Sequence, residues 1–328
     1  MSTLSITVKT IKRPLKSRLY ISDFHWDMIN CVVVTATQNG HQGRGEGIPI
    51  FYRSENVESL AAQIESIRPF IRSVDDRFSL ATLLPANGAR CAVDAALWDL
   101  QAKMKGKSVT SLAGLPDLQP IETVDTIYLD TPEKMATRAA EMSDLPIIKL
   151  KLGATEDERR IQAVRDRLPS TRLIIDANAG WSLSTLEKML PVLEAARVEM
   201  VEQPLPPGQD QALSKIDSPI PLCADESFQT ADDLPFCASH YQAINVKLDK
   251  CGGLTSALAI GQMARQMGLK LMVGNMIGSS LGMAPAFVFA QSCDWCDLDG
   301  PLSLAVDEEP ALTFEKGNVA PPATALWG

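Results

Sequence analysis

The sequence has no long apolar run, no leader pattern and no framework of cysteines. None of its apolar stretches reaches the roughly 20 residues that span a bilayer. The N-terminal segment MSTLSITVKTIKRPLK alternates and carries charge throughout, unlike a signal peptide. Seven cysteines, an odd number without regular spacing, fit a reducing compartment. These features predict a cytoplasmic protein without a membrane partner.

Histidine is also scarce, which weakens the one cysteine motif in the chain. Cys293 and Cys296 form C-x-x-C, but the three histidines and the other cysteines complete no zinc site around it. We therefore interpret these two thiols as buried in or beside a strand. The net charge of −9 argues against nucleic acid or an anionic membrane as the main partner.

The first part of the chain predicts a small α+β domain. Residues 1–50 contain three alternating segments with a turn at Gln38-Asn39-Gly40, which favours an antiparallel meander. Apolar residues at helical spacing predict helices over 56–73 and over 89–104. The second of these carries small residues on one face, which indicates close packing on another element. A third short helix, SVTSLAGL, follows.

From about residue 120 strands and helices alternate strictly, which is typical of an α/β fold. We predict a modified (β/α) barrel over 119–300, after an N-terminal α+β domain over 1–118. Residues 301–328 are expected to form a tail that returns to the N-terminal domain, with ALTF as a possible short strand. The eight expected barrel strands are 123–128, 147–151, 172–177, 198–202, 220–225, 242–248, 270–275 and 295–299.

Five charged residues recur near the ends of these strands at almost one period. They are Lys151, Asp176, Glu202, Asp225 and Lys247, with steps of 25, 26, 23 and 22 residues. Such a spacing holds one strand, one helix and two loops. Because the C-terminal ends of barrel strands meet at one mouth, three carboxylates and two lysines are expected to converge there.

The residue types indicate a metal site flanked by two bases. Three carboxylates without His or Cys favour Mg²⁺, with Mn²⁺ as a possible substitute. Lys149 and Lys151 share one face of their strand, and two ammonium groups that close are expected to lower each other's pKa towards that of a general base. Lys247 comes from the opposite side of the barrel. A Schiff-base lysine is the alternative, but aldolases that use one need no metal.

The motifs K-x-K, D-x-N, E-Q-P, D-E-S and K-x-D together resemble those of the enolase superfamily, in its muconate-lactonising-enzyme subgroup. The resemblance covers nearly the whole chain and includes ALWDL, in what would be a capping domain, and KLDKCGGL. It implies that Asp176, Glu202 and Asp225 bind Mg²⁺ and that Lys151 and Lys247 are the acid/base pair. Lys149 would tune Lys151 and touch the substrate carboxylate. The family is often oligomeric, so a homo-oligomer is expected.

Asp297 and Asp299, at the end of the last strand, form a D-x-D similar to that of the dipeptide epimerases of this family. There such a pair holds the α-ammonium of a dipeptide, as charge complementarity favours. The alternative is a turn and helix cap before Gly300. Thr126 and Asn178 are also predicted to contact the substrate. The resemblance implies that one lysine removes the α-hydrogen of the C-terminal residue, that an ene-diolate forms, and that the other lysine returns a proton to the opposite face.

Specificity is expected to lie in a loop of the capping domain. The L-Ala-D/L-Glu epimerases carry an arginine there, where this chain has Asp23, followed by Phe24 and Trp26. An aspartate would repel an acidic side chain of the substrate and attract a basic one. The aromatic rings of Phe24 and Trp26 could stack on such a basic side chain. Ala-Glu is therefore predicted to be a poor substrate, and dipeptides with a cationic or hydrophobic C-terminal residue better ones. The alternative is that these are exposed loop residues.

Two other functions stay open at this point. One is a lyase or cycloisomerase of the same subgroup, similar to o-succinylbenzoate synthase. The other is a barrel that binds a ligand without turnover, although pure binding would not require two opposed lysines.

Overall fold

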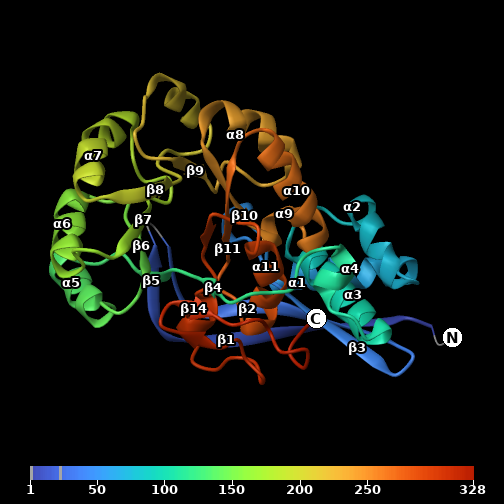
Figure 1. The fold of residues 1–328 in the computed structure, drawn as a ribbon. Coiled ribbons are helices and arrows are strands. Elements are labelled where there is room, and N and C mark those ends of the chain that lie inside the picture. The colour runs from blue at the N-terminus through green and yellow to red at the C-terminus, as the bar shows by residue number, and fades with distance from the viewer. Residues whose placement is uncertain (1–2, 22–23) are drawn as a thin grey trace.

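The computed structural model describes residues 3–21 and 24–328. Its N-terminal part is an antiparallel sheet in the order β1-β2-β3, covered on one side by helices, as the sequence predicted (Figure 1). The elements of this part are β1 (Ser5–Ile21), β2 (Phe24–Gln38), β3 (His41–Gly47), α1 (Val57–Ile67), α2 (Leu80–Leu83), α3 (Gly88–Lys105) and α4 (Val109–Ala113). The helix α1 ends before the expected residue 73, because Pro69 follows and the chain passes into a 3₁₀ turn at Arg68–Phe70.

Strand β2 is buried on both faces, which explains its unbroken apolar run. Val32 and Val34 point to one side and pack with α1 and α3 in the core of the N-terminal part. Cys31 and Val33 point to the other side and belong to the large core shared with the barrel. Because strand side chains alternate, this single strand joins the two cores.

Strand β3 lies unusually close to α3, and its glycines allow this. A Cβ atom at Gly45 would lie 2.7 Å from Ala96 N and 2.8 Å from Ala95 Cβ. Gly43 and Gly47 meet the same helix at similarly short range. The small residues seen on one face of this helix in the sequence are therefore a packing face, as predicted.

The second part is a parallel sheet of eight strands in the order β5 to β12, with helices around its outside (Figure 1). The sheet edges meet where Val124 N donates to Cys296 O at 2.9 Å, so the strands close into a barrel and the predicted fold class is confirmed. The strands are β5 (Asp125–Ile127), β6 (Ile147–Lys151), β7 (Arg172–Asp176), β8 (Val198–Glu202), β9 (Leu222–Ala224), β10 (Ala243–Lys247), β11 (Lys270–Gly274) and β12 (Trp295–Cys296). The helices are α5 (Pro132–Glu141), α6 (Asp157–Arg167), α7 (Leu183–Ala195), α8 (Leu234–His240), α9 (Leu248–Cys251), α10 (Leu254–Gln266) and α11 (Ser280–Ala290).

One side chain from each strand, or from just before it, fills the barrel floor. This ring is a separate buried cluster below the mouth, so the barrel is a packed core rather than a channel. Its members are Val124, Ile147, Ile174, Met200, Cys223, Ala243, Met272 and Trp295.

The expectation for the ALTF strand is wrong in its partner. The strand is β13 (Phe314–Glu315), which pairs with β14 (Asn318–Val319), and β14 pairs with β4 (Ile121–Glu122) rather than with the N-terminal sheet. The tail reaches the N-terminal part through other residues: Glu308 binds Arg13 and Arg44, and Trp327 Nε1 donates to Ala95 O at 3.0 Å.

Two buried carboxylates fasten the N-terminal part over the barrel mouth. Asp249, in α9, accepts from Ile48 N at 2.8 Å. Glu46, in β3, accepts from Ser279 N and Ser279 Oγ, both at 2.7 Å, where α11 begins. Both contacts join the segment after β2 to residues that follow barrel strands, in α9 and at the start of α11, so the two parts enclose one space.

The remaining sequence expectations concern the membrane and the thiols. No helix in the described part of the chain is long and apolar enough to cross a membrane. Cys296 is buried in β12, and the partly buried Cys293 thiol, just before it, donates to Phe289 O. Both are free thiols, which agrees with the prediction that they are packing residues.

The contact between β3 and α3 yields the first prediction. Gly45→Ala should lower the free energy of unfolding by about 2 kcal/mol or more, because its methyl group overlaps the α3 backbone. Urea unfolding followed by circular dichroism measures this. Gly40→Asn, at a turn where a Cβ meets nothing within 4 Å and where asparagine tolerates the positive φ, is the control and should cost little. Equal stability of the two variants would contradict the packing argument.

Candidate active site

A cavity lies at the C-terminal ends of the barrel strands, between them and the N-terminal part. Barrel residues and N-terminal residues contribute to its wall, so neither part forms it alone. The predicted site residues in its lining are Trp26, Thr126, Lys149, Lys151, Asn178, Asp225, Lys247, Asp297 and Asp299.

The three predicted metal ligands come from neighbouring strands and are buried. Asp176 ends β7 and lies in register with Glu202, which ends β8, while Asp225 directly follows β9. Burial and the adjacent Asp176 raise the pKa of Glu202 to about 7. Burial acts the same way on Asp176, but Lys151 and Lys149 outweigh it and lower its pKa to about 2.

Lys149 lies at the centre of the negative charge. Its Nζ atom is 3.1 Å from Asp176, 2.7 Å from Glu202 and 2.8 Å from Asp297. Lys151 Nζ donates to Asp176 Oδ2 at 2.5 Å.

The predicted lowering of the lysine pKa is wrong for Lys149. Burial lowers the pKa of Lys149, but Asp297, Glu202 and Asp176 outweigh this and hold it well above its usual range. The sequence argument counted the neighbouring lysine and not the carboxylates that tertiary structure brings from β7, β8 and the end of β12.

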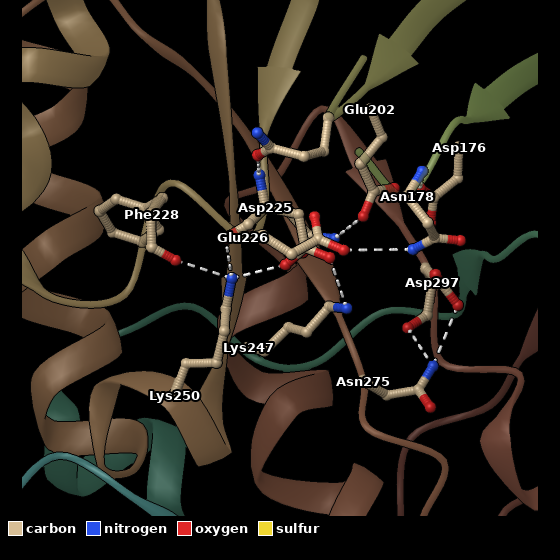
Figure 2. Close-up of polar contacts among 12 residues, drawn as sticks. Asp176, Asn178, Glu202, Asp225, Glu226, Phe228, Lys247, Lys250, Asn275 and Asp297 are labelled. Atoms are coloured by element: carbon tan, nitrogen blue, oxygen red, sulfur yellow. Dashed lines mark hydrogen bonds and ion pairs between the residues drawn. The ribbon is translucent and has the colours of Figure 1, made fainter. Parts of the chain in front are cut away.

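Two lysines share Asp225 (Figure 2). Lys247 Nζ donates to Asp225 Oδ2 at 2.8 Å, while Lys250 Nζ donates to Asp225 Oδ1 at 2.5 Å and to the carbonyls of Asp225 and Phe228. Lys247 faces the cavity, whereas Lys250 is only 1% exposed. Burial lowers the pKa of Lys247, but Asp225 and Glu202 reverse this and raise it above its usual range.

Sequence reasoning missed the residues that orient these carboxylates. Asn245 Nδ2 donates to Glu202 Oε1 at 2.8 Å. Gln203 Oε1 accepts from Asp225 N at 2.9 Å, which ties the end of β8 to the end of β9. Strand alternation could have revealed Asn245, since it lies two residues before Lys247 and shares its face. Lys250 lies in the KLDKCGGL motif, but nothing in the sequence names its partner.

The donor set fits a hard divalent cation, although lysines contact it in this structure. Among the described residues, no group of three or more acidic, histidine or cysteine side chains is arranged as a ready ligand set. The three carboxylates nonetheless supply only oxygen, as Mg²⁺ prefers. Glu202 Oε2, Glu226 Oε2 and Asn178 Oδ1 are buried acceptors without a hydrogen-bond partner, and Glu202 Oε2 has only its ion contact with Lys149. A cation that replaced the lysine contacts would relieve this surplus of acceptors.

Asp297 and Asp299 also line the cavity and are called the acidic pair below. Thr126 Oγ1 donates to Asp299 Oδ2 at 2.5 Å, and Lys149 Nζ donates to Asp297 Oδ2 at 2.8 Å. Burial, Asp297 and Asp125 raise the pKa of Asp299 well above its usual range. Asp299 precedes a 3₁₀ turn, but its side chain does not cap that turn, which disfavours the alternative of a helix cap.

The predicted specificity loop is described only in part. Trp26 lines the cavity and meets the Phe51 ring edge-on, with 5.0 Å between the ring centroids. Asp23 and the side chain of Phe24 lie outside the described residues, so their proposed contacts stay predictions.

The fold and the site define an enzyme of the enolase superfamily. Residues 5–114 match the N-terminal domain of the mandelate racemase/muconate lactonizing enzyme family, and residues 133–325 match the enolase C-terminal domain-like family. The chain therefore belongs to the mandelate racemase/muconate lactonizing enzyme family, which confirms the resemblance and the isomerase class predicted from the sequence.

The chain aligns with almost the whole length of two curated relatives. The chain is 38% identical over 300 residues to an N-acetyl-D-glutamate racemase of Pseudoalteromonas sp, with 90% of this chain and 95% of the relative aligned. It is 37% identical over 317 residues to the L-Ala-D/L-Glu epimerase of Escherichia coli K12, with 95% and 99% aligned.

Solved structures agree with this fold. An enolase family member from Agrobacterium tumefaciens with homology to dipeptide epimerases, holding sodium and L-Ala-L-Glu, has a TM-score of 0.95 and 40% identity over 99% of this chain and 100% of that one. A dipeptide epimerase from Cytophaga hutchinsonii, complexed with Mg and D-Ala-L-Val, has a TM-score of 0.91 and 28% identity over 98% and 94%.

The two lysines on Asp225 yield the second prediction. Lys250→Met should lower the free energy of unfolding by about 3 kcal/mol, because it leaves a buried carboxylate oxygen and two carbonyls without their donor. Lys247→Met, which removes one contact at the cavity wall, should lower it by clearly less. Chemical denaturation of both variants tests this, and a stable Lys250→Met protein would contradict it.

Proposed function

We propose that this protein is a Mg²⁺-dependent dipeptide epimerase that inverts the α-carbon of the C-terminal residue. The observation that carries the proposal is one cavity lined by two lysines from opposite strands and by the acidic pair. A free dipeptide has the matching charges, with a carboxylate on the reacting carbon and an ammonium group one residue away. The dipeptide epimerases among the relatives support it.

Lys151 and Lys247 would carry the proton transfer. They end β6 and β10, four strands apart in the barrel order, so they approach the cavity from opposite sides. One amine removes the α-hydrogen and the other ammonium delivers a proton to the opposite face, which inverts the centre. Mg²⁺, held by Asp176, Glu202 and Asp225, would supply positive charge for the substrate carboxylate as its α-hydrogen leaves.

Release of the lysines from their carboxylates is part of this scheme. Lys151 and Lys247 donate to Asp176 and Asp225, which are themselves proposed ligands. While these ion pairs last, both ammonium groups are directed at carboxylates and not at a substrate. Coordination would occupy the same oxygens and so free both amines for the substrate.

The acidic pair favours a dipeptide over an N-acylated amino acid. Racemisation of an N-acylated amino acid is the second candidate, because the N-acetyl-D-glutamate racemase shares 38% identity with this chain. An N-acyl group offers no cation to Asp297 and Asp299, whereas the ammonium group of a dipeptide would add a second cation beside Lys149. We rank it second for this reason.

The side-chain subsite supports a hydrophobic or cationic C-terminal residue. Near the N-terminal part the cavity is lined by Trp26, Phe51, Tyr52 and Glu55. The cations in the described lining are Lys149, Lys151 and Lys247, which already contact carboxylates, and no arginine is among them. A glutamate side chain would find no free positive charge there. A related structure holds L-Ala-L-Glu. The proposed preference of this chain therefore differs from the ligand of that relative and can be tested directly.

We also propose that the enzyme works in the cytoplasm as a homo-oligomer. The seven free thiols support a reducing compartment. The assembly remains a prediction from the family.

Loss of either lysine gives the third prediction. Lys151→Ala and Lys247→Ala should each abolish epimerisation, because inversion needs a proton donor and an acceptor on opposite faces. The appearance of the NMR signals of the L,D-dipeptide, with Mg²⁺ and a pool of L,L-dipeptides, measures the reaction, because exchange with D₂O alone needs only one of the two lysines. An active Lys247→Ala protein at near wild-type rate would refute the two-base scheme, and a wild type that exchanges no dipeptide would refute the proposed function.

Substrate preference gives the fourth prediction. In a library of Ala-Xaa dipeptides, those with Lys, Arg or a large hydrophobic residue should exchange with a higher kcat/KM than Ala-Glu, by about tenfold for one unfavourable charge. Mass spectrometry of deuterium uptake ranks the whole library at once. A clear preference for Ala-Glu would show that the subsite has been assigned wrongly.

A further inference from the structure

Asn275 links the loop after β11 to the acidic pair, and no motif recognised in the sequence includes it. Its amide nitrogen donates to Asp297 O at 2.9 Å, to Asp297 Oδ1 at 3.0 Å and to Asp299 Oδ1 at 3.4 Å. Figure 2 shows the amide of Asn275 directed at the Asp297 carboxylate. The residue also lines the cavity.

The oxygen of the same amide holds the adjoining loop. Asn275 Oδ1 accepts from Ile277 N at 2.7 Å, the pattern of an Asx turn. Ile277 has a φ of +58°, a left-handed conformation that β-branched residues seldom adopt. A Cβ at Gly300 would lie 2.7 Å from Asn275 Oδ1, so the chain after Asp299 packs directly on this amide. Asn275 therefore orients both a cavity wall and the acidic pair.

The contacts to the acidic pair order it and leave its oxygens able to accept further hydrogen bonds. Lys149 and Thr126 donate to the Oδ2 atoms of Asp297 and Asp299, and Asn275 donates to both Oδ1 atoms. Each carboxylate oxygen has two lone pairs, so each can accept one more hydrogen bond. Of the three protein donors only Lys149 is charged, and it also contacts Asp176 and Glu202. The neutral amide orders the pair without placing a second cation beside Lys149.

On the basis of the proposed function, we propose that Asn275 is the positioning residue that makes this enzyme selective for a free amino terminus. Its amide holds Asp297 Oδ1 and Asp299 Oδ1 on the same donor, so that one ammonium group can bridge the two carboxylates. An N-acylated substrate carries no such group and gains nothing from this order. The effect belongs to substrate binding and not to the proton transfer, because Asn275 has no contact with Lys151 or Lys247 among its hydrogen bonds.

The variant Asn275→Ser separates the role of the amide oxygen, which accepts in the turn, from that of the amide nitrogen, which donates to the acidic pair. A serine hydroxyl can still accept from the backbone N–H two residues on, which keeps the turn, but it is too short to donate to both aspartates. We expect the KM of a hydrophobic dipeptide such as Ala-Leu to rise about tenfold, equivalent to about 1.4 kcal/mol, with kcat nearly unchanged. Asn275→Ala should raise it at least as much. N-acetyl-Ala-Leu, measured as substrate or competitive inhibitor, should bind both variants as it binds the wild type.

Asn87→Ala is the matched control. Asn87 caps α3 through Ala89 N and Arg90 N, away from the cavity, so its loss should lower stability and leave KM unchanged. A wild-type KM for Asn275→Ser, with or without impairment of Asn275→Ala, would overturn the inference and leave only a loop role. An equal change for the acetylated compound would also overturn it. A wild type inactive on every dipeptide would instead overturn the proposed function.

Discussion

The burial of three carboxylates at the ends of adjacent parallel strands is the constraint on which the site depends. Asp176, Glu202 and Asp225 lie where water is largely excluded, and isolated buried anions are too costly to persist. The barrel meets this with lysines from the strands on either side: Lys149 and Lys151 from β6, and Lys247 and Lys250 from β10 and α9. The groups proposed for chemistry are thus also those that make the metal-free fold electrostatically tolerable. Stability and reactivity use the same ion pairs.

Lys149 couples the proposed metal ligands to the acidic pair. It contacts the proposed metal ligands Asp176 and Glu202 as well as Asp297 of the acidic pair, and it is itself almost fully buried. A substrate with a carboxylate at one end and an ammonium at the other would complement this distribution. Binding to the metal ligands or to the acidic pair would alter the charge around Lys149, so the two groups are electrostatically linked through one buried ammonium group.

The N-terminal part closes this arrangement because its own packing leaves little freedom. Strand β2 belongs to both cores, the glycines of β3 bring α3 close, and Glu46 and Asp249 bond across to the barrel loops. Trp26 belongs to β2, and the pairing of β2 with β1 fixes its position at the cavity. Changes in this part are expected to act on substrate choice, whereas changes at the strand ends act on proton transfer.

The sequence by itself determined the barrel, the order of its strands and the meeting of five charges at its mouth. Those features follow from local rules, since buried parallel strands need apolar runs and their ends recur with each βα unit. Tertiary structure alone decided the partners of these residues. Carboxylates from β7, from β8 and from the end of β12 raise the pKa of Lys149, and Lys250 donates to Asp225 Oδ1. Asn245 and Asn275 donate to buried carboxylates, and the tail strand pairs with β14, which in turn pairs with β4. A hydrogen bond or pKa depends on atoms within a few ångströms, and a sequence gives residue types and spacing but not which side chains come that close.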